Sequence, residues 1–160
     1  MNAGILPICL LFVAAGLTLS FASFRDALLA AAALIVAALI IASLNFPPSA
    51  LEPVLVGLWA SCIATVALMH LARRLGTGWA IATGLNAGGW AGALAALSSL
   101  RPPMLYSFPI LLLALPGQWL VGRGYGIAVK VVGSWVVAVA TLAIFVSLTP
   151  TPGYKPDHMQ

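Results

Sequence analysis

Residues 26–45 read DALLAAAALIVAALIIASLN, and this stretch decides the fold class. It is charged only at its first residue, and its length matches the roughly 20 apolar residues that a helix needs to cross a bilayer. Its side chains do not alternate with a period of two, as the strands of a membrane β-barrel would. The stretch therefore predicts an all-α membrane protein.

Similar apolar runs lie on both sides of this one. We expect a polytopic transmembrane helical bundle of six spans, with approximate ranges 4–23, 26–45, 54–72, 78–99, 104–122 and 125–148. Arginines, glycines and the proline pairs at 47–48 and 102–103 separate the runs, because proline removes a backbone donor and stops a helix. Pro109 and Pro116 interrupt the fifth span, so five spans with a re-entrant fifth segment is the alternative.

The basic residues of the breaks predict an orientation. Counting alternate sides of the six spans separates Arg25, Arg73, Arg74 and Arg123 from Arg101 and Lys155. The positive-inside rule places the first group in the cytoplasm, so both termini face outward. We expect a multi-pass protein of a bacterial-type inner membrane, with a single bundle over residues 1–148 and an extracytoplasmic tail over residues 149–160.

The fourth predicted span carries the most specific packing pattern. Small residues recur there every four positions, at Ala80, Gly84, Gly88, Gly92 and Ala96. Such a strip lets another helix backbone approach closely, which favours helix association inside a membrane. The neighbour is either another span of the same chain or a helix of a second protein.

Polar residues inside the spans are few. His70, Asn86, Gln118 and Lys130 all fall in the cytoplasmic half of the bilayer if the predicted topology holds. One interpretation is a polar pocket open to the cytoplasm, in which Lys130 supplies charge. The other is separate structural roles, in which Lys130 extends its ammonium to the interface, His70 lies beside the arginines, and the two amides bond neighbouring helices.

The residues needed for several common functions of membrane proteins are missing from the spans. No Asp or Glu lies inside a span apart from the terminal position of the second, so a carboxylate relay for ion-coupled transport is missing. Ser61 and Ser134 have no acid–histidine pair arranged for nucleophilic catalysis, and two histidines are too few for haem ligation across a bundle. We therefore expect no enzyme, no cofactor, no metal site and no nucleic-acid partner.

Residues 127–135, Ile-Ala-Val-Lys-Val-Val-Gly-Ser-Trp, resemble the last span of the hydrogenase/urease accessory membrane family, regarded as nickel permeases. A basic residue, two aliphatic residues and Gly-Ser-Trp carry the resemblance. It implies a membrane bundle and, more distantly, metal transport. The early histidine–aspartate signature of that family has no counterpart in this chain, so no ligand set is carried over.

Two functions follow from these patterns as hypotheses. The first is a non-catalytic integral membrane subunit or assembly factor of a larger membrane complex, which would bind partner subunits or copies of itself. Small size, missing coupling carboxylates and the glycine strip favour it. The alternative is a small homo-oligomeric permease or channel for a metal ion or a compact solute, favoured by the polar residues and the resemblance.

Overall fold

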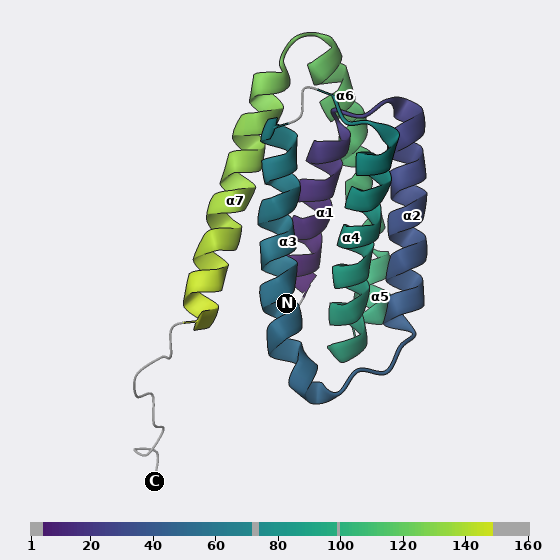
Figure 1. Ribbon diagram of the computed structural model, residues 1–160, viewed down its shortest axis with the longest axis vertical. Coiled ribbons are helices and arrows are strands. Elements are labelled where there is room, and N and C mark those ends of the chain that lie inside the picture. The colour runs from purple at the N-terminus through teal and green to yellow at the C-terminus, as the bar shows by residue number, and fades with distance from the viewer. Residues whose placement is uncertain (1–4, 72–73, 99, 149–160) are drawn as a thin grey trace.

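The computed structural model describes residues 5–71, 74–98 and 100–148, and over these ranges the chain is helical with no β-strand. The elements are α1 (Ile5–Leu19), α2 (Phe24–Ala42), η1 (Pro48–Ala50), α3 (Leu51–Leu71), α4 (Thr77–Leu97), α5 (Arg101–Leu105), η2 (Phe108–Leu113), α6 (Ala114–Gly122) and α7 (Gly126–Leu148). The predicted all-α class is confirmed (Figure 1). The expected tail, residues 149–160, lies outside the described residues.

Among the described residues, five segments are long and apolar enough to cross a bilayer: Phe24–Ala42, Pro48–Leu71, Thr77–Leu97, Pro102–Gly122 and Gly126–Val146. The protein is thus a multi-pass membrane protein. The first expected span, 4–23, is shorter in the structure, because α1 has 15 residues and rises only about 22 Å at 1.5 Å per residue.

The six segments alternate in direction. In Figure 1, α1 begins and α7 ends toward the lower end, whereas the α1–α2, α3–α4 and α6–α7 connections lie at the upper end. Arg25 at the start of α2, and Arg74 and Arg123 in the connections, lie here, and we call this end of the bundle the arginine end. Three of the four basic residues that the sequence predicts to share one side therefore do so, and the fourth, Arg73, lies outside the described residues.

The fifth segment traverses the bundle instead of turning back. It consists of α5, η2 and α6, and in Figure 1 it runs from the lower end to the arginine end. Pro109 lies in the 3₁₀ helix η2 and Pro116 in α6, which explains the irregular winding. Phe108 stacks on Phe12 of α1, with 5.7 Å between ring centroids. The six-span arrangement fits this course better than the re-entrant alternative.

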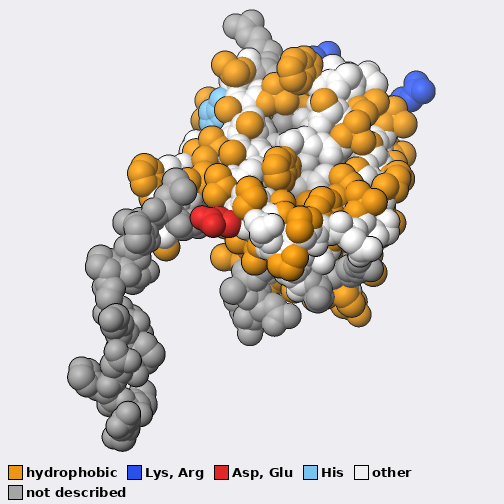
Figure 2. Space-filling view, turned by 60° about the horizontal axis from the view of Figure 1, so that its bottom comes forward, with side chains coloured by type: hydrophobic (Ala, Val, Ile, Leu, Met, Phe, Trp, Pro, Cys, Tyr) orange, Lys and Arg blue, Asp and Glu red, His pale blue; other side chains and the backbone are white. Residues whose placement is uncertain are grey.

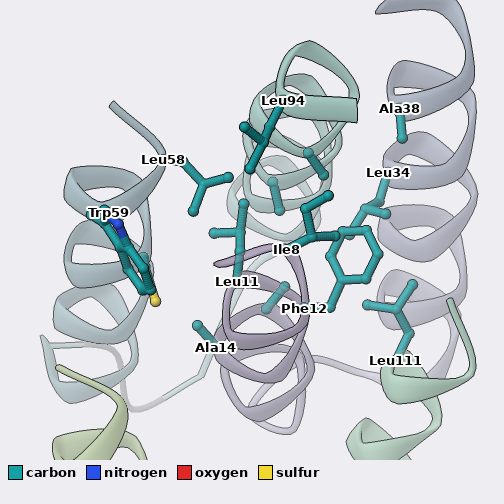
Figure 3. Packing of buried hydrophobic residues seen from close by; sticks show 14 of the residues in the cluster. Ile8, Leu11, Phe12, Ala14, Leu34, Ala38, Leu58, Trp59, Leu94 and Leu111 are labelled. Carbon is teal, nitrogen blue, oxygen red and sulfur yellow. The ribbon is translucent and has the colours of Figure 1, made fainter. Parts of the chain in front are cut away.

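Helix α1 lies in the middle of the bundle. Its side chains Ile8, Leu11 and Phe12 are fully buried, and Figure 3 shows them among residues of α2, α3, α4 and η2. A helix that is apolar on every face is expected in such a central position. The peripheral helices, in contrast, expose large apolar side chains, including Val36, Leu142 and Phe145. Figure 2 shows this apolar surface, which suits contact with lipid.

Two local features set the helix ends at the arginine end. Ser23 caps the N-terminus of α2, because its hydroxyl oxygen accepts the backbone N–H of Asp26 and its O–H donates to the Asp26 carboxylate. Gly124 has φ of 88°, and this left-handed conformation, which favours glycine, reverses the chain between α6 and α7. Arg123 lies over the Trp119 ring, 4.1 Å from its centroid.

Candidate functional site

The glycine strip of α4 packs against α2 of the same chain. A Cβ added at Gly84 or Gly88 would lie 2.9 Å from the carbonyl carbon of Ala30 or Leu34, respectively. At Gly92 it would lie 2.5 Å from the carbonyl oxygen of Ala38. Ala80 is fully buried in the same contact region, and Ala96 is half-buried at the far end.

The spacing of the two helices matches along this contact. The residues met on α2 also recur every four positions, so one backbone follows the other over two turns. Of the two neighbours that the sequence left open, the structure therefore places a span of the same chain on the strip. A partner would have to use another face of α4.

Asn86 lies on that other face. It is exposed, and it is one residue from the midpoint of α4, so its amide lies near the middle of the membrane. Its Nδ2 donates to Ser61 Oγ of α3. Among the described residues, its amide oxygen has no hydrogen-bond partner.

Two surface hollows flank Asn86, and its side chain contributes to both. One, of about 420 Å³, lies between α3 and α4 and is lined by small residues such as Ala64, Ala67 and Ala82. The other, of about 340 Å³, includes Leu85 and Gly89. Gly78, Ala82, Asn86 and Gly89 give this side of α4 a second small-residue surface, which we call the outer face.

His70 and Lys130 are brought together at the contact of α3 with α7. Lys130 Nζ donates to the backbone carbonyl of His70, at 3.2 Å, and lies 5.5 Å from the Phe21 ring centroid. His70 Nδ1 lies 3.0 Å from the Val66 carbonyl, which can only accept, so this nitrogen carries a proton. Ser134 Oγ lies 3.3 Å from His70 Nε2 and donates to the Lys130 carbonyl.

This arrangement assigns local roles to three residues of the 127–135 motif. Lys130 caps the carbonyl end of α3, since His70 is the next-to-last residue of that helix. Gly133 faces Met69 and Val66 of α3, and a Cβ there would lie 3.1 Å from Val66 Cγ1. Ser134 bonds His70. The motif thus forms the α3–α7 contact.

Gln118 lies elsewhere again. Its Nε2 donates to the carbonyl oxygens of Leu19 and Ala22, both at 3.4 Å, where the chain turns from α1 to α2. It lines a cavity at the arginine end to which neither His70 nor Asn86 contributes.

The four polar residues therefore do not form one pocket. The Asn86 partner Ser61 precedes His70 by nine residues on α3, a separation of roughly 13 Å along the axis. Sequence reasoning missed two partners, Ser61 and Ser134, because it weighed these hydroxyls only as nucleophiles. It also missed the outer face, although the spacing of Gly78, Ala82, Asn86 and Gly89 is visible in the sequence.

The described residues offer few side-chain arrangements for catalysis or metal binding. Although Ser134 lies beside His70, the other imidazole nitrogen faces a backbone carbonyl and not a carboxylate. Within residues 5–71, 74–98 and 100–148, no three His, Cys, Asp or Glu side chains gather at metal-binding distance. Comparison with protein-family models, curated proteins and solved structures finds no match.

Proposed function

We propose that this chain is a non-catalytic integral membrane subunit or assembly factor, and that it binds a transmembrane helix of a partner protein on the outer face of α4. The position of Asn86 is the observation that carries the proposal. An amide exposed to hydrocarbon lacks the water that would satisfy it, and one bond to Ser61 leaves part of its capacity unused. A partner helix with a polar side chain would supply the missing bond.

The surroundings of Asn86 suit a helix. Ala82 and Gly89 lie about one turn on either side of it, and small residues at such positions let a neighbouring backbone approach closely. The hollow between α3 and α4 is lined mainly by alanines and other short or apolar side chains, into which a partner's side chains would fit. Interhelical hydrogen bonds of this kind contribute on the order of 1 kcal/mol in membranes.

The packing of the core favours the subunit hypothesis over a transport path that runs through a single copy of the chain. Ile8, Leu11 and Phe12 fill the centre of the bundle, and the buried hydroxyls of Thr18 and Ser20 are bonded to backbone carbonyls of α1 and, for Thr18, also of α3. The alternative, a homo-oligomeric permease or channel, would place a second copy on the outer face and its solute path between copies.

The test is the size and composition of the complex after mild solubilisation of native membranes. Ala82→Leu fills the outer face, and Asn86→Leu removes its amide. Ala32→Leu makes the same substitution as the first at an exposed position of α2 and serves as the matched control. Co-purification of another membrane protein with wild type and Ala32→Leu, and its loss with the two outer-face variants, is the expected result.

Two outcomes contradict the proposal. If wild type contains only copies of this chain and the outer-face variants break that oligomer, the permease alternative is favoured. If all three variants keep the wild-type complex, the outer face contacts lipid alone.

A further inference from the structure

The largest of the described cavities lies at the arginine end and is independent of the outer face. It has a volume of about 760 Å³ and is formed where the α1–α2 turn, the α3–α4 turn and the end of α6 meet. We call it the interfacial cavity, because helix ends of a membrane bundle lie at the depth of the lipid headgroups. Its polar lining includes Ser20, Ser23, Asp26, Arg74 and Gln118.

Hydrogen bonds and close packing between three segments fix the shape of the cavity. The Leu75 N–H donates to the Phe21 carbonyl at 3.0 Å, which joins the α1–α2 turn to the α3–α4 turn. The side-chain amide of Gln118, on α6, donates to the carbonyls of Leu19 and Ala22 in the α1–α2 turn. Gly117 lies directly against Ser20, so α6 is close to the turn. Three segments distant in sequence are therefore fixed around one space.

Among the described residues that line the cavity, Arg74 is the cation and Asp26 is the anion. Arg74 is exposed and offers a planar fork of donors that suits a phosphate group. Asp26 is half-exposed, and Ser23 O–H donates to its Oδ2, at 2.6 Å, which orients the carboxylate. Phe21, Leu75 and Val121 add apolar wall. The lining therefore fits a ligand that carries phosphate and ammonium groups on an apolar body.

We propose that the interfacial cavity binds the headgroup of phosphatidylethanolamine, with the phosphate at Arg74 and the ammonium at Asp26. An anionic headgroup without the ammonium would leave Asp26 beside negative charge. A phosphocholine headgroup has the same charges, but its quaternary nitrogen has no N–H to donate to the carboxylate. The site thus selects among phospholipids through Asp26 and holds all of them through Arg74.

The experiment measures lipid retention by the purified full chain. Protein in detergent is mixed with equal amounts of phosphatidylethanolamine, phosphatidylglycerol and phosphatidylcholine with identical acyl chains, and the lipids bound are counted by native mass spectrometry. We expect wild type to retain phosphatidylethanolamine roughly tenfold better than the other two.

Two variants separate the roles of the charges, and two controls match them. Asp26→Asn keeps a hydrogen-bonding group beside Ser23 and should abolish the preference while lipids still bind. Arg74→Gln should lower retention of all three lipids. Glu52→Gln, outside the cavity, and Arg123→Gln, at the same end but engaged with Trp119, should behave as wild type.

Equal retention of the three lipids by wild type would overturn the proposal. So would Arg123→Gln lowering retention as much as Arg74→Gln, because binding would then reflect only the general positive charge of this end. Thermal unfolding of each variant, measured alongside, verifies that the bundle is intact. Arg74 lies in an exposed turn, so its variant keeps the test decisive even if Asp26→Asn unfolds.

Discussion

Two neighbouring glycines of α4 allow a controlled test of the α2–α4 contact. Gly88 faces the α2 backbone, where an added Cβ would lie 2.9 Å from the Leu34 carbonyl carbon. At Gly89 an added Cβ would meet only the tip of the Ile41 side chain, at 3.5 Å. The substitution to alanine is identical at both positions, and its effect on helix propensity, up to about 1 kcal/mol, is the same for both variants.

The expected cost of Gly88→Ala follows from the geometry. Ordinary Cβ contacts begin near 3.4 Å, and the Leu34 carbonyl oxygen lies nearer to the added Cβ than the carbonyl carbon does, so α4 would have to move more than 0.5 Å away from a rigid backbone. A gap of 0.5–1 Å already removes a quarter to a half of the dispersion energy of the atoms that separate, and Gly84 and Gly92 share the same interface. Overpacking of this kind typically costs about 1–3 kcal/mol.

The assay is thermal unfolding of both variants in the same detergent. We expect Gly88→Ala to unfold at a temperature lower by roughly 2–10 °C than Gly89→Ala, from the usual relation between stability and unfolding midpoint for a chain of this size. Gly89→Ala should equal wild type or exceed it slightly. If the two variants unfold at the same temperature, the backbone contact of α2 with α4 is not as close as described, and the reasoning fails.

Two further predictions concern α7 and the orientation. Lys130→Met should lower the stability of the bundle by roughly 1 kcal/mol, measured by thermal unfolding, because it removes the cap on the His70 carbonyl. Lys130→Arg keeps the charge and the donors and should recover most of the lost stability. If Lys130→Met is as stable as wild type, the lysine only extends to the interface. Single cysteines at Ser49 and Gly76, in a chain lacking Cys9 and Cys62, should react with an impermeant thiol reagent from opposite sides of the membrane, Gly76 from the cytoplasm; labelling of both from one side would contradict the alternating topology.

The fold class and the helix positions could be read from the sequence because the bilayer imposes a length and excludes charge. Residues 26–45 and the breaks at Pro47 and Gly124 carry that information directly. The central position of α1 could not be read in the same way. Its residues are apolar on every face, as are those of the lipid-facing helices, so composition does not distinguish a buried span from a peripheral one.

In the candidate site, too, the sequence predicts some features and only the tertiary structure determines the others. A period of four identifies Gly84, Gly88 and Gly92 as a contact surface, but it does not identify the neighbour, which depends on how the helices fold back on each other. Likewise, Lys130 and His70 are 60 residues apart in sequence, and only the course of α7 along α3 makes one the cap of the other.

The two small-residue faces of α4 explain why a partner surface remains on this helix. Between apolar helices in lipid, association depends on close packing and polar bonds, since lipid competes for every other apolar contact. The face with the regular four-residue spacing is covered by α2, whose backbone lies so close that a Cβ added at Gly84 or Gly88 would overlap it. The outer face has fewer glycines, but it carries Asn86, whose amide is only partly satisfied by Ser61. Packing inside the chain thus uses the more regular face, and the face left outside is the one where a polar bond to a second helix would contribute most.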